Sequence, residues 1–320
     1  MKEIIAMLPA PIRQILTALP AEVRDSLEEI RLRQNQPLEV RYSQQASYVT
    51  TSGQLTANVR QGWTLTEEHV TKLINQISQH SLYALEEELK RGYITVAGGH
   101  RIGIAGKVVM EGGEVKGIRD ITSFNIRIAR EKKGAAQQVL PFLFQGGKVL
   151  NTLIVSPPSC GKTTLLRDIA RSLSYGSEWS SSRKVGIVDE RSELAGSVNG
   201  VPQRDVGPRT DVLDACPKAV GMMMLIRSMS PDVLIADEIG RTEDGEAIWE
   251  AIHAGVAVIC SAHGSDLQEV ALRPTLGKLM QHRAFSRYIV LSRQHGAGTI
   301  QGIYDASLAP LERENLPWSS

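Results

Sequence analysis

The chain has few cysteines, few aromatic residues and almost no net charge. Its three cysteines, Cys160, Cys216 and Cys260, are widely separated in a chain of 320 residues, which excludes a disulfide framework and a four-cysteine zinc site. This usage favours a reducing, cytosolic compartment. Aromatic residues make up 5% of the chain and the formal net charge is +1. We therefore expect no nucleic-acid partner, because neither a broad basic surface nor a stacking platform is present.

Long hydrophobic runs are also absent. No window reaches about 18 consecutive apolar residues, the length that a membrane-spanning helix needs. Pro9, Pro11 and Pro20 interrupt the beginning of the chain, which argues against a signal peptide there. We expect any association with a membrane to be peripheral.

Residues 1–134 have the mixed pattern of an α+β domain. The first 30 residues predict two short amphipathic helices, and "EIRLRQNQPLEVRYS" alternates like two strands joined by a turn. A helical period then runs from Thr66, a suitable N-cap, to Gly92, a suitable stop. The glycine-rich stretch that follows predicts short strands of a small antiparallel sheet.

Residues 135–308 alternate regularly between strands and helices. The apolar runs "NTLIVS", "KVGIVDE", "PDVLIADE" and "VAVICSAHG" predict strands, and helical patterns such as "LDACPKAVGMMMLIRSM" lie between them. Such alternation predicts an α/β domain, with a mostly parallel sheet covered by helices on both faces. Residues 309–320 are expected to form a C-terminal tail.

The stretch "SPPSCGKTT" nearly spells the phosphate-binding loop G-x-x-x-x-G-K-[ST], with Ser156 in place of the first glycine. A predicted strand precedes it and a predicted helix follows, which is the context that this loop requires. Lys162 is expected to reach the β- and γ-phosphates, and Thr163 to ligate Mg²⁺. Without an N-K-x-D tetrad for guanine, ATP is the expected nucleotide. The predicted nucleotide-binding residues are Ser156, Pro157, Pro158, Ser159, Cys160, Gly161, Lys162, Thr163 and Thr164.

Acidic residues and a histidine end three further predicted strands. Asp237 is expected to hold Mg²⁺ through water, and Glu238 to orient and deprotonate the attacking water. Glu190, at the end of "KVGIVDE", is a second candidate acid, and His263 is a candidate sensor of the γ-phosphate. Cys160, beside the loop lysine at a helix N-terminus, is either a reactive thiol that ATP protects or an inert small residue that fills the loop.

Four segments follow one another in a fixed order: "SPPSCGKTTLLRD", "VDERSE", "RSMSPDVLIADEIGRTEDGEAI" and "SAHG". This series of phosphate loop, aspartate box, Walker B segment and histidine box resembles the secretion ATPases that power type II and type IV secretion and pilus machines. Phrases such as "EEIRLRQNQPLEV" and "GGHRIGIAGK" resemble the stage III sporulation AA family of spore-forming bacteria, so the resemblance covers nearly the whole chain. The departures are Ser156 and Ser159 in place of loop glycines, and Asp237-Glu238 where many secretion ATPases have Gly-Glu.

The resemblance implies a RecA-like, Mg²⁺-dependent ATPase that forms a ring, expected to be a hexamer. It also implies a membrane platform protein as partner, and work on a channel between mother cell and forespore from the mother-cell side of the forespore membrane. By the same resemblance Glu190, Glu238 and His263 take catalytic roles. Arginines that could reach the γ-phosphate are expected among Arg101, Arg127, Arg227 and Arg241.

Two other functions are compatible with the residues. RecA-like rings also move nucleic acids, so a nucleic-acid-dependent ATPase is one alternative, although composition argues against it. The serine-substituted loop allows a second alternative, a nucleotide-gated scaffold with little hydrolysis. ATPase assays with single-stranded DNA and with a Glu238→Gln variant distinguish the three.

Overall fold

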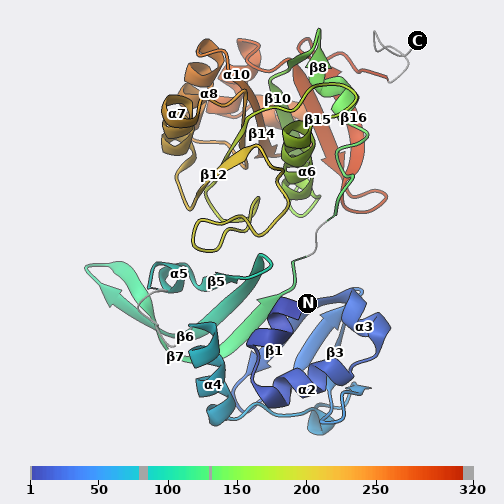
Figure 1. The fold of residues 1–320 in the computed structure, drawn as a ribbon, viewed down its shortest axis with the longest axis vertical. Coiled ribbons are helices and arrows are strands. Elements are labelled where there is room, and N and C mark those ends of the chain that lie inside the picture. The colour runs from blue at the N-terminus through green and yellow to red at the C-terminus, as the bar shows by residue number, and fades with distance from the viewer. Residues whose placement is uncertain (1, 79–85, 130–131, 313–320) are drawn as a thin grey trace. The chain divides into compact units, whose positions relative to one another are not determined.

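The computed structural model describes residues 2–78, 86–129 and 132–312. The chain divides into two compact units, Met1–Arg130 and Glu131–Ser320 (Figure 1). The sequence pattern predicted this boundary at 134/135. Each unit has its own hydrophobic core.

The first unit is a seven-stranded sheet with strand order β4-β3-β2-β1-β7-β6-β5, in which all neighbours are antiparallel. The described helices are α1 (Lys2–Met7), α2 (Ala10–Ala18), α3 (Ala21–Ser26), η1 (Val59–Gln61), α4 (Glu67–Ile77) and α5 (Glu86–Arg91). The strands are β1 (Leu27–Arg33), β2 (Glu39–Tyr42), β3 (Gln45–Val49), β4 (Leu55–Thr56), β5 (Tyr93–Val96), β6 (His100–Glu111) and β7 (Glu114–Arg127). Residues 1–30 thus contain three described helices and the start of a strand, where two helices were predicted.

Local sequence signals account for several of these boundaries. Prolines precede α2 and α3, because a proline fits the start of a helix but not its interior. The predicted cap of α4 is confirmed: the Thr66 hydroxyl accepts the N–H of His69, and the His69 ring accepts the N–H of Thr66. The predicted strand pair around Gln36 is also confirmed as β1 and β2. Part of the predicted helix 66–92 lies outside the described residues.

The second unit is a three-layer α/β structure. Its main sheet has the order β12-β11-β13-β14-β10-β15-β16, parallel except for β16. The strands are β8 (Phe144–Gln145), β9 (Lys148–Val149), β10 (Thr152–Ser156), β11 (Val185–Asp189), β12 (Thr210–Asp214), β13 (Val233–Ala236), β14 (Ala257–His263), β15 (Arg287–Ser292) and β16 (Thr299–Asp305). The described helices are η3 (Leu140–Leu143), α6 (Lys162–Tyr175), α7 (Lys218–Met229), α8 (Thr242–His253), α9 (Leu267–Ala271) and α10 (Pro274–Gln281).

Alternation along the parallel strands divides the core between the two faces of the sheet. Ile154 and Ile259 pack with α6, whereas Leu153, Val155 and Val258 pack with α7, α8 and α10. Successive strand residues point to opposite faces, so a sheet covered on both faces needs apolar residues at every position. This confirms the predicted RecA-like core. The predicted helix beginning "LDACPKA" starts only at Lys218, because Leu213 and Asp214 complete strand β12.

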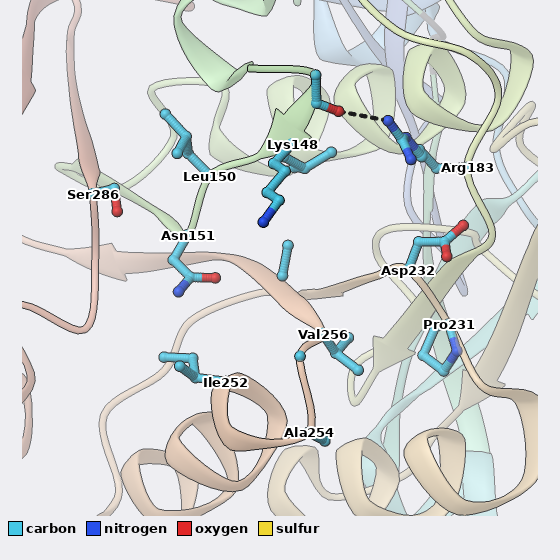
Figure 2. Close-up of a pocket in the computed structure, with 14 residues that line it drawn as sticks. Lys148, Leu150, Asn151, Arg183, Pro231, Asp232, Ile252, Ala254, Val256 and Ser286 are labelled. Carbon is cyan, nitrogen blue, oxygen red and sulfur yellow. Dashed lines mark hydrogen bonds between the residues drawn. The ribbon is translucent and has the colours of Figure 1, made fainter. Parts of the chain in front are cut away.

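The amino ends of the parallel strands surround a hollow of about 510 Å³ (Figure 2). Three of its polar side chains bond to backbone groups of neighbouring segments. The Asn151 side-chain oxygen accepts the N–H of Val258 at 2.9 Å, and Asp232 accepts the N–H of Lys184 at 2.8 Å. The Arg183 guanidinium donates to the carbonyl of Gly147 at 2.6 Å. These contacts hold the strand starts together.

Candidate active site

The phosphate-binding loop connects β10 to α6 at the carboxyl edge of the parallel sheet. Ser156 is the last residue of β10, is fully buried and is not among the residues with positive φ, so a glycine is not required there. Ser159 and Gly161 do have left-handed backbone angles, with φ of +59° and +90°. A Cβ at Gly161 would lie 3.2 Å from the backbone nitrogen of Gly298. The loop thus keeps its one glycine where both backbone angle and space demand it.

Lys162 begins α6 and is largely buried, with 7% of its surface exposed. Its ammonium donates to Nδ1 of His263 at 2.9 Å. Burial lowers the pKa of Lys162, and the nearby carboxylates of Asp237 and Glu238 oppose this change. The N-terminus of a helix also favours an anion at this point. Phosphate oxygens here would meet a cation and backbone N–H groups together.

Thr163, the residue after Lys162, connects the loop to the acidic segment that follows β13. The Thr163 hydroxyl donates to Oδ2 of Asp237 at 2.9 Å. A hydroxyl and a carboxylate oxygen converge there, beside the loop lysine. Mg²⁺ prefers oxygen ligands and keeps several waters, using one or two carboxylates together with substrate phosphates. The donor set fits Mg²⁺ of this kind. Within the described part of the chain, no group of three or more His, Cys, Asp or Glu side chains is arranged as a metal site.

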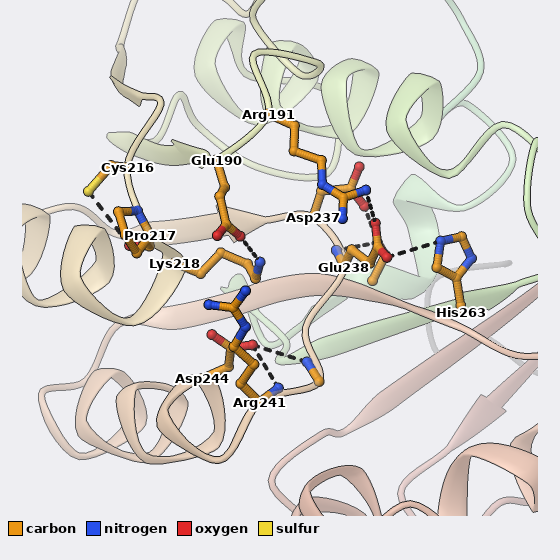
Figure 3. A network of polar contacts seen from close by, with 12 residues as sticks. Glu190, Arg191, Cys216, Pro217, Lys218, Asp237, Glu238, Arg241, Asp244 and His263 are labelled. Atoms are coloured by element: carbon orange, nitrogen blue, oxygen red, sulfur yellow. Dashed lines mark hydrogen bonds and ion pairs between the residues drawn. The ribbon is translucent and has the colours of Figure 1, made fainter. Parts of the chain in front are cut away.

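Glu238 lies at the centre of a polar network (Figure 3). Its Oε1 is 3.3 Å from Nε2 of His263, and its Oε2 accepts from Nη1 of Arg191 at 3.1 Å. An ammonium can only donate, so Nδ1 of His263 is the acceptor for Lys162, and Nε2 carries the proton that faces Glu238. Lys162, His263 and Glu238 therefore form one continuous series of contacts from the loop to the acid.

Glu190 is placed by a second ion pair, with Lys218 at the first turn of α7 (Figure 3). The side chain of Lys218 is only 10% exposed and that of Glu190 is 26% exposed. The neighbouring Asp189 plays a different part, because its carboxylate accepts the N–H groups of Glu193 and Ala195 at 2.7 and 2.8 Å. Burial raises the pKa of Asp189, and these backbone bonds counteract it. Asp189 thus shapes the loop that follows β11, whereas Glu190 pairs with Lys218.

The four candidate arginines lie in different places. Arg241 precedes α8, where the Asp244 carboxylate caps the helix by accepting its N–H. Arg227 is exposed in the last turn of α7, roughly three turns from the end that carries Lys218. Arg101 and Arg127 belong to the first unit and are opposite each other in the pairing of β6 with β7. The structure thus brings none of the four into the hydrogen-bonded series of Lys162, His263 and Glu238 as described above.

A second hollow, of about 340 Å³, lies beside the loop. It is lined by Gly161, Thr164 and Leu165 on the loop side and by Ala297 and Gly298 on the side that follows β15. Gln137 and Gln138 also line it. The space begins where the phosphate loop ends, and it offers both amide groups and apolar surface.

The sequence analysis did not identify Arg191, Lys218 and Ser261 as site residues. Ser261 is fully buried on β14, and its hydroxyl donates to Asp237 and accepts the N–H of Glu238. Arg191 and Ser261 lie within the segments "VDERSE" and "SAHG", so the motifs were a usable signal for both. Lys218 had no such signal, because only the fold brings β12 beside β11.

Of the two alternatives for Cys160, the structure favours the inert residue. The residue is 1% exposed and belongs to the core that packs against α6. Its thiol lies 3.6 Å from the carbonyl oxygen of Pro158. A thiol must reach its reagent, so this burial outweighs the favourable position beside Lys162. Cys160 packs in the core that supports the phosphate-binding loop.

Among the described helices, none combines the length and apolarity needed to cross a membrane.

Comparison with known proteins agrees with this architecture. The ATPase DotB of Legionella pneumophila has a similar structure, with a TM-score of 0.56 at 16% identity over 88% of this chain and 76% of that chain. The pilus retraction motor PilT, solved with bound ADP, gives 0.55 at 17% identity over 84% and 75%. These likenesses show a shared fold.

Sequence comparison is more specific. Stage III sporulation protein AA of Bacillus subtilis (strain 168) is 51% identical over 305 residues, which is 95% of each chain. The model of the family described as "Sporulation stage III, protein AA" matches residues 1–309. This chain belongs to the stage III sporulation protein AA family, and it shares its fold with the ATPase DotB and the pilus retraction motor PilT.

Proposed function

We propose that this protein is a Mg²⁺-dependent ATPase whose subunits form a ring, by analogy a hexamer. The observation that carries the proposal is the convergence of Lys162, Thr163, Asp237, Glu238 and His263 at one edge of the sheet. These five residues lie at or after the carboxyl ends of three neighbouring strands, β10, β13 and β14. Phosphate binding and activation of water need this combination of cation, metal-binding oxygens and carboxylate.

Each side chain has a distinct role in the proposed reaction. Lys162 and the loop N–H groups bind the phosphates, and Thr163 with Asp237 would hold Mg²⁺, which neutralises phosphate charge when bound. Glu238 orients a water and accepts its proton. His263 lies between Lys162 and Glu238, so it can transmit occupancy of the phosphate site to the acid. We propose that the hollow lined by Thr164 and Gly298 accepts the ribose and base.

The biological role follows from the family. In a sporulation protein with the fold of secretion motors, ATP turnover would drive assembly of, or transport through, a channel between mother cell and forespore. We propose that the ring acts from the mother-cell side of the forespore membrane, on a membrane platform protein. Arg101, Arg127, Arg227 and Arg241 are the candidates for a guanidinium that completes a neighbour's site, which would couple charge neutralisation to closure between subunits.

The test is steady-state ATP hydrolysis over a wide range of protein concentration, for the native chain and for Lys162→Ala and Glu238→Gln. The rate per subunit should rise with concentration, and both variants should lose about 10²–10⁴-fold. Single-stranded DNA should leave the rate unchanged. Tight nucleotide binding with a rate no higher than that of Glu238→Gln would instead indicate a nucleotide-gated scaffold.

Rings assembled from two different variants can identify the arginine that completes a neighbouring subunit's site. Lys162→Ala subunits are mixed with subunits that lack one of the four arginines, each inactive alone if that arginine is essential. Activity returns only if the arginine serves the neighbouring subunit's site, because some interfaces then contain both native residues. An arginine whose loss leaves the native rate intact is excluded.

A further inference from the structure

Ser261 contacts both acids of the Walker B segment through one hydroxyl group. It lies on β14 and has no exposed surface. Its Oγ donates to Oδ1 of Asp237 and accepts the backbone N–H of Glu238 at 3.0 Å. A serine hydroxyl has one proton to donate and lone pairs to accept, so both functions are in use at once.

The register of the sheet explains why a residue of β14 reaches these acids. β13 and β14 are parallel, with Ala236 opposite Cys260. The next residue on each strand is therefore Asp237 on one and Ser261 on the other. Ser261 also shares a strand face with His263, because residues two apart point to the same side. The serine and the histidine thus face the phosphate loop together.

The bond from Ser261 fixes the rotation of the Asp237 carboxylate. Oδ1 accepts from Ser261, and Oδ2 accepts from Thr163 at 2.9 Å. Turning the carboxylate away from Thr163 would break the bond to a fully buried hydroxyl, which is costly. Oδ2 is thereby directed to the point where the donor set fits Mg²⁺.

The same residue braces the backbone of Glu238. Glu238 has a φ of +52°, a left-handed angle that is unfavourable for a non-glycine residue. The Ser261 hydroxyl accepts the N–H of Glu238, and the Ser261 carbonyl accepts the N–H of Ile239 at 2.8 Å. Hydrogen bonds before and after Glu238 thus hold its left-handed backbone in place. The Glu238 carboxylate remains directed at His263.

We propose that Ser261 is a positioning residue for the nucleotide site: it aims Asp237 at the metal and holds Glu238 in its reactive orientation. This inference rests on the proposed function. It assigns no contact between Ser261 and nucleotide. Loss of the hydroxyl should therefore weaken the metal-dependent part of nucleotide binding, while the metal-free part, which depends on Lys162 and the loop, remains.

The experiment measures the affinity of the full chain for a fluorescent ATP analogue, with Mg²⁺ and with EDTA. The variants are Ser261→Ala, Ser261→Thr, which retains a hydroxyl on a residue suited to strands, and Ser174→Ala as a matched control. Ser174 is equally buried and accepts the N–H of Arg209 at 2.6 Å, in the last turn of α6, far from its loop end.

For Ser261→Ala we expect the gain in affinity on adding Mg²⁺ to fall by roughly 10- to 100-fold, with affinity in EDTA unchanged. Ser261→Thr and Ser174→Ala should keep the native gain. A native gain in Ser261→Ala would overturn the inference, as would an equal loss of affinity in EDTA, which would indicate collapse of the loop. Failure of the native chain to bind the analogue would instead refute the proposed function itself.

Discussion

The two edges of one parallel sheet use their polar side chains differently. At the amino ends of β10, β11, β13 and β14, three side chains bond to backbone groups around a hollow of about 510 Å³: Asn151 before β10, Arg183 before β11 and Asp232 before β13 (Figure 2). At the carboxyl ends of the same strands, side chains bond mainly to one another (Figure 3).

The bonding partners of the polar side chains distinguish residues that support the fold from residues that serve the chemistry, and they do so better than the volume of a hollow does. A side chain that satisfies a backbone group completes the fold. Cations and carboxylates that pair across strands, partly buried, carry a desolvation cost that folding alone does not require. In parallel sheets the strand carboxyl ends also meet the N-termini of the following helices, where anions bind.

The largest effect is expected at the Glu190–Lys218 pair. Glu190→Gln leaves the ammonium of Lys218 buried without its counter-charge, which should cost about 3 kcal/mol. For a unit of this size that lowers the melting temperature by roughly 6–12 °C. The double variant Glu190→Gln/Lys218→Met should recover most of the loss, because both charges are removed. Equal melting of the single variant and native chain would show that the pair is dispensable for stability.

His263→Ala should separate activity from stability at the carboxyl edge. The side chain is 35% exposed, so little packing is lost and melting should hardly change. Hydrolysis should fall by about 10²-fold, since the connection between Lys162 and Glu238 is broken. A lower melting temperature with an unchanged rate of hydrolysis would contradict the proposed difference between the two edges of the sheet.

Asn151→Ala is the corresponding test at the amino edge of the sheet, where stability should change and nucleotide affinity should not. It leaves the N–H of Val258 without its acceptor, and Val258 is fully buried. Stability should decrease by about 1–3 kcal/mol, measured by thermal melting. Affinity for nucleotide in the folded chain should match the native value, and a marked loss would mean that the amino edge contributes to the site.

The smallest effect concerns protons at Lys162. Burial lowers its pKa in the free protein, and a bound polyphosphate would raise it. Nucleotide binding should therefore take up protons once the pH exceeds the lowered pKa, and affinity should fall by up to about tenfold per pH unit above it. Calorimetry in buffers of different ionisation enthalpy counts these protons. Uptake that does not increase with pH would assign the effect to another group.

The sequence determined the parts of the protein that depend on neighbours in the chain. The apolar strand runs and the Thr66 cap are local requirements, and each was readable from residue type and spacing. The strand–loop–helix order around Lys162 likewise predicted a phosphate loop. The sequence left open whether Cys160 is reactive or inert, because charge and helix position are local but depth in the core is not.

Only the tertiary structure decided which residues meet. Strand order places β14 between β10 and β13, and this brings Ser261 to Asp237 and His263 to Lys162. The same order sets Lys218 beside Glu190. Period and spacing specify which face a side chain takes, but not which strand lies next to it. Hydrogen bonding between distant strands settles that, and with it the geometry of the site.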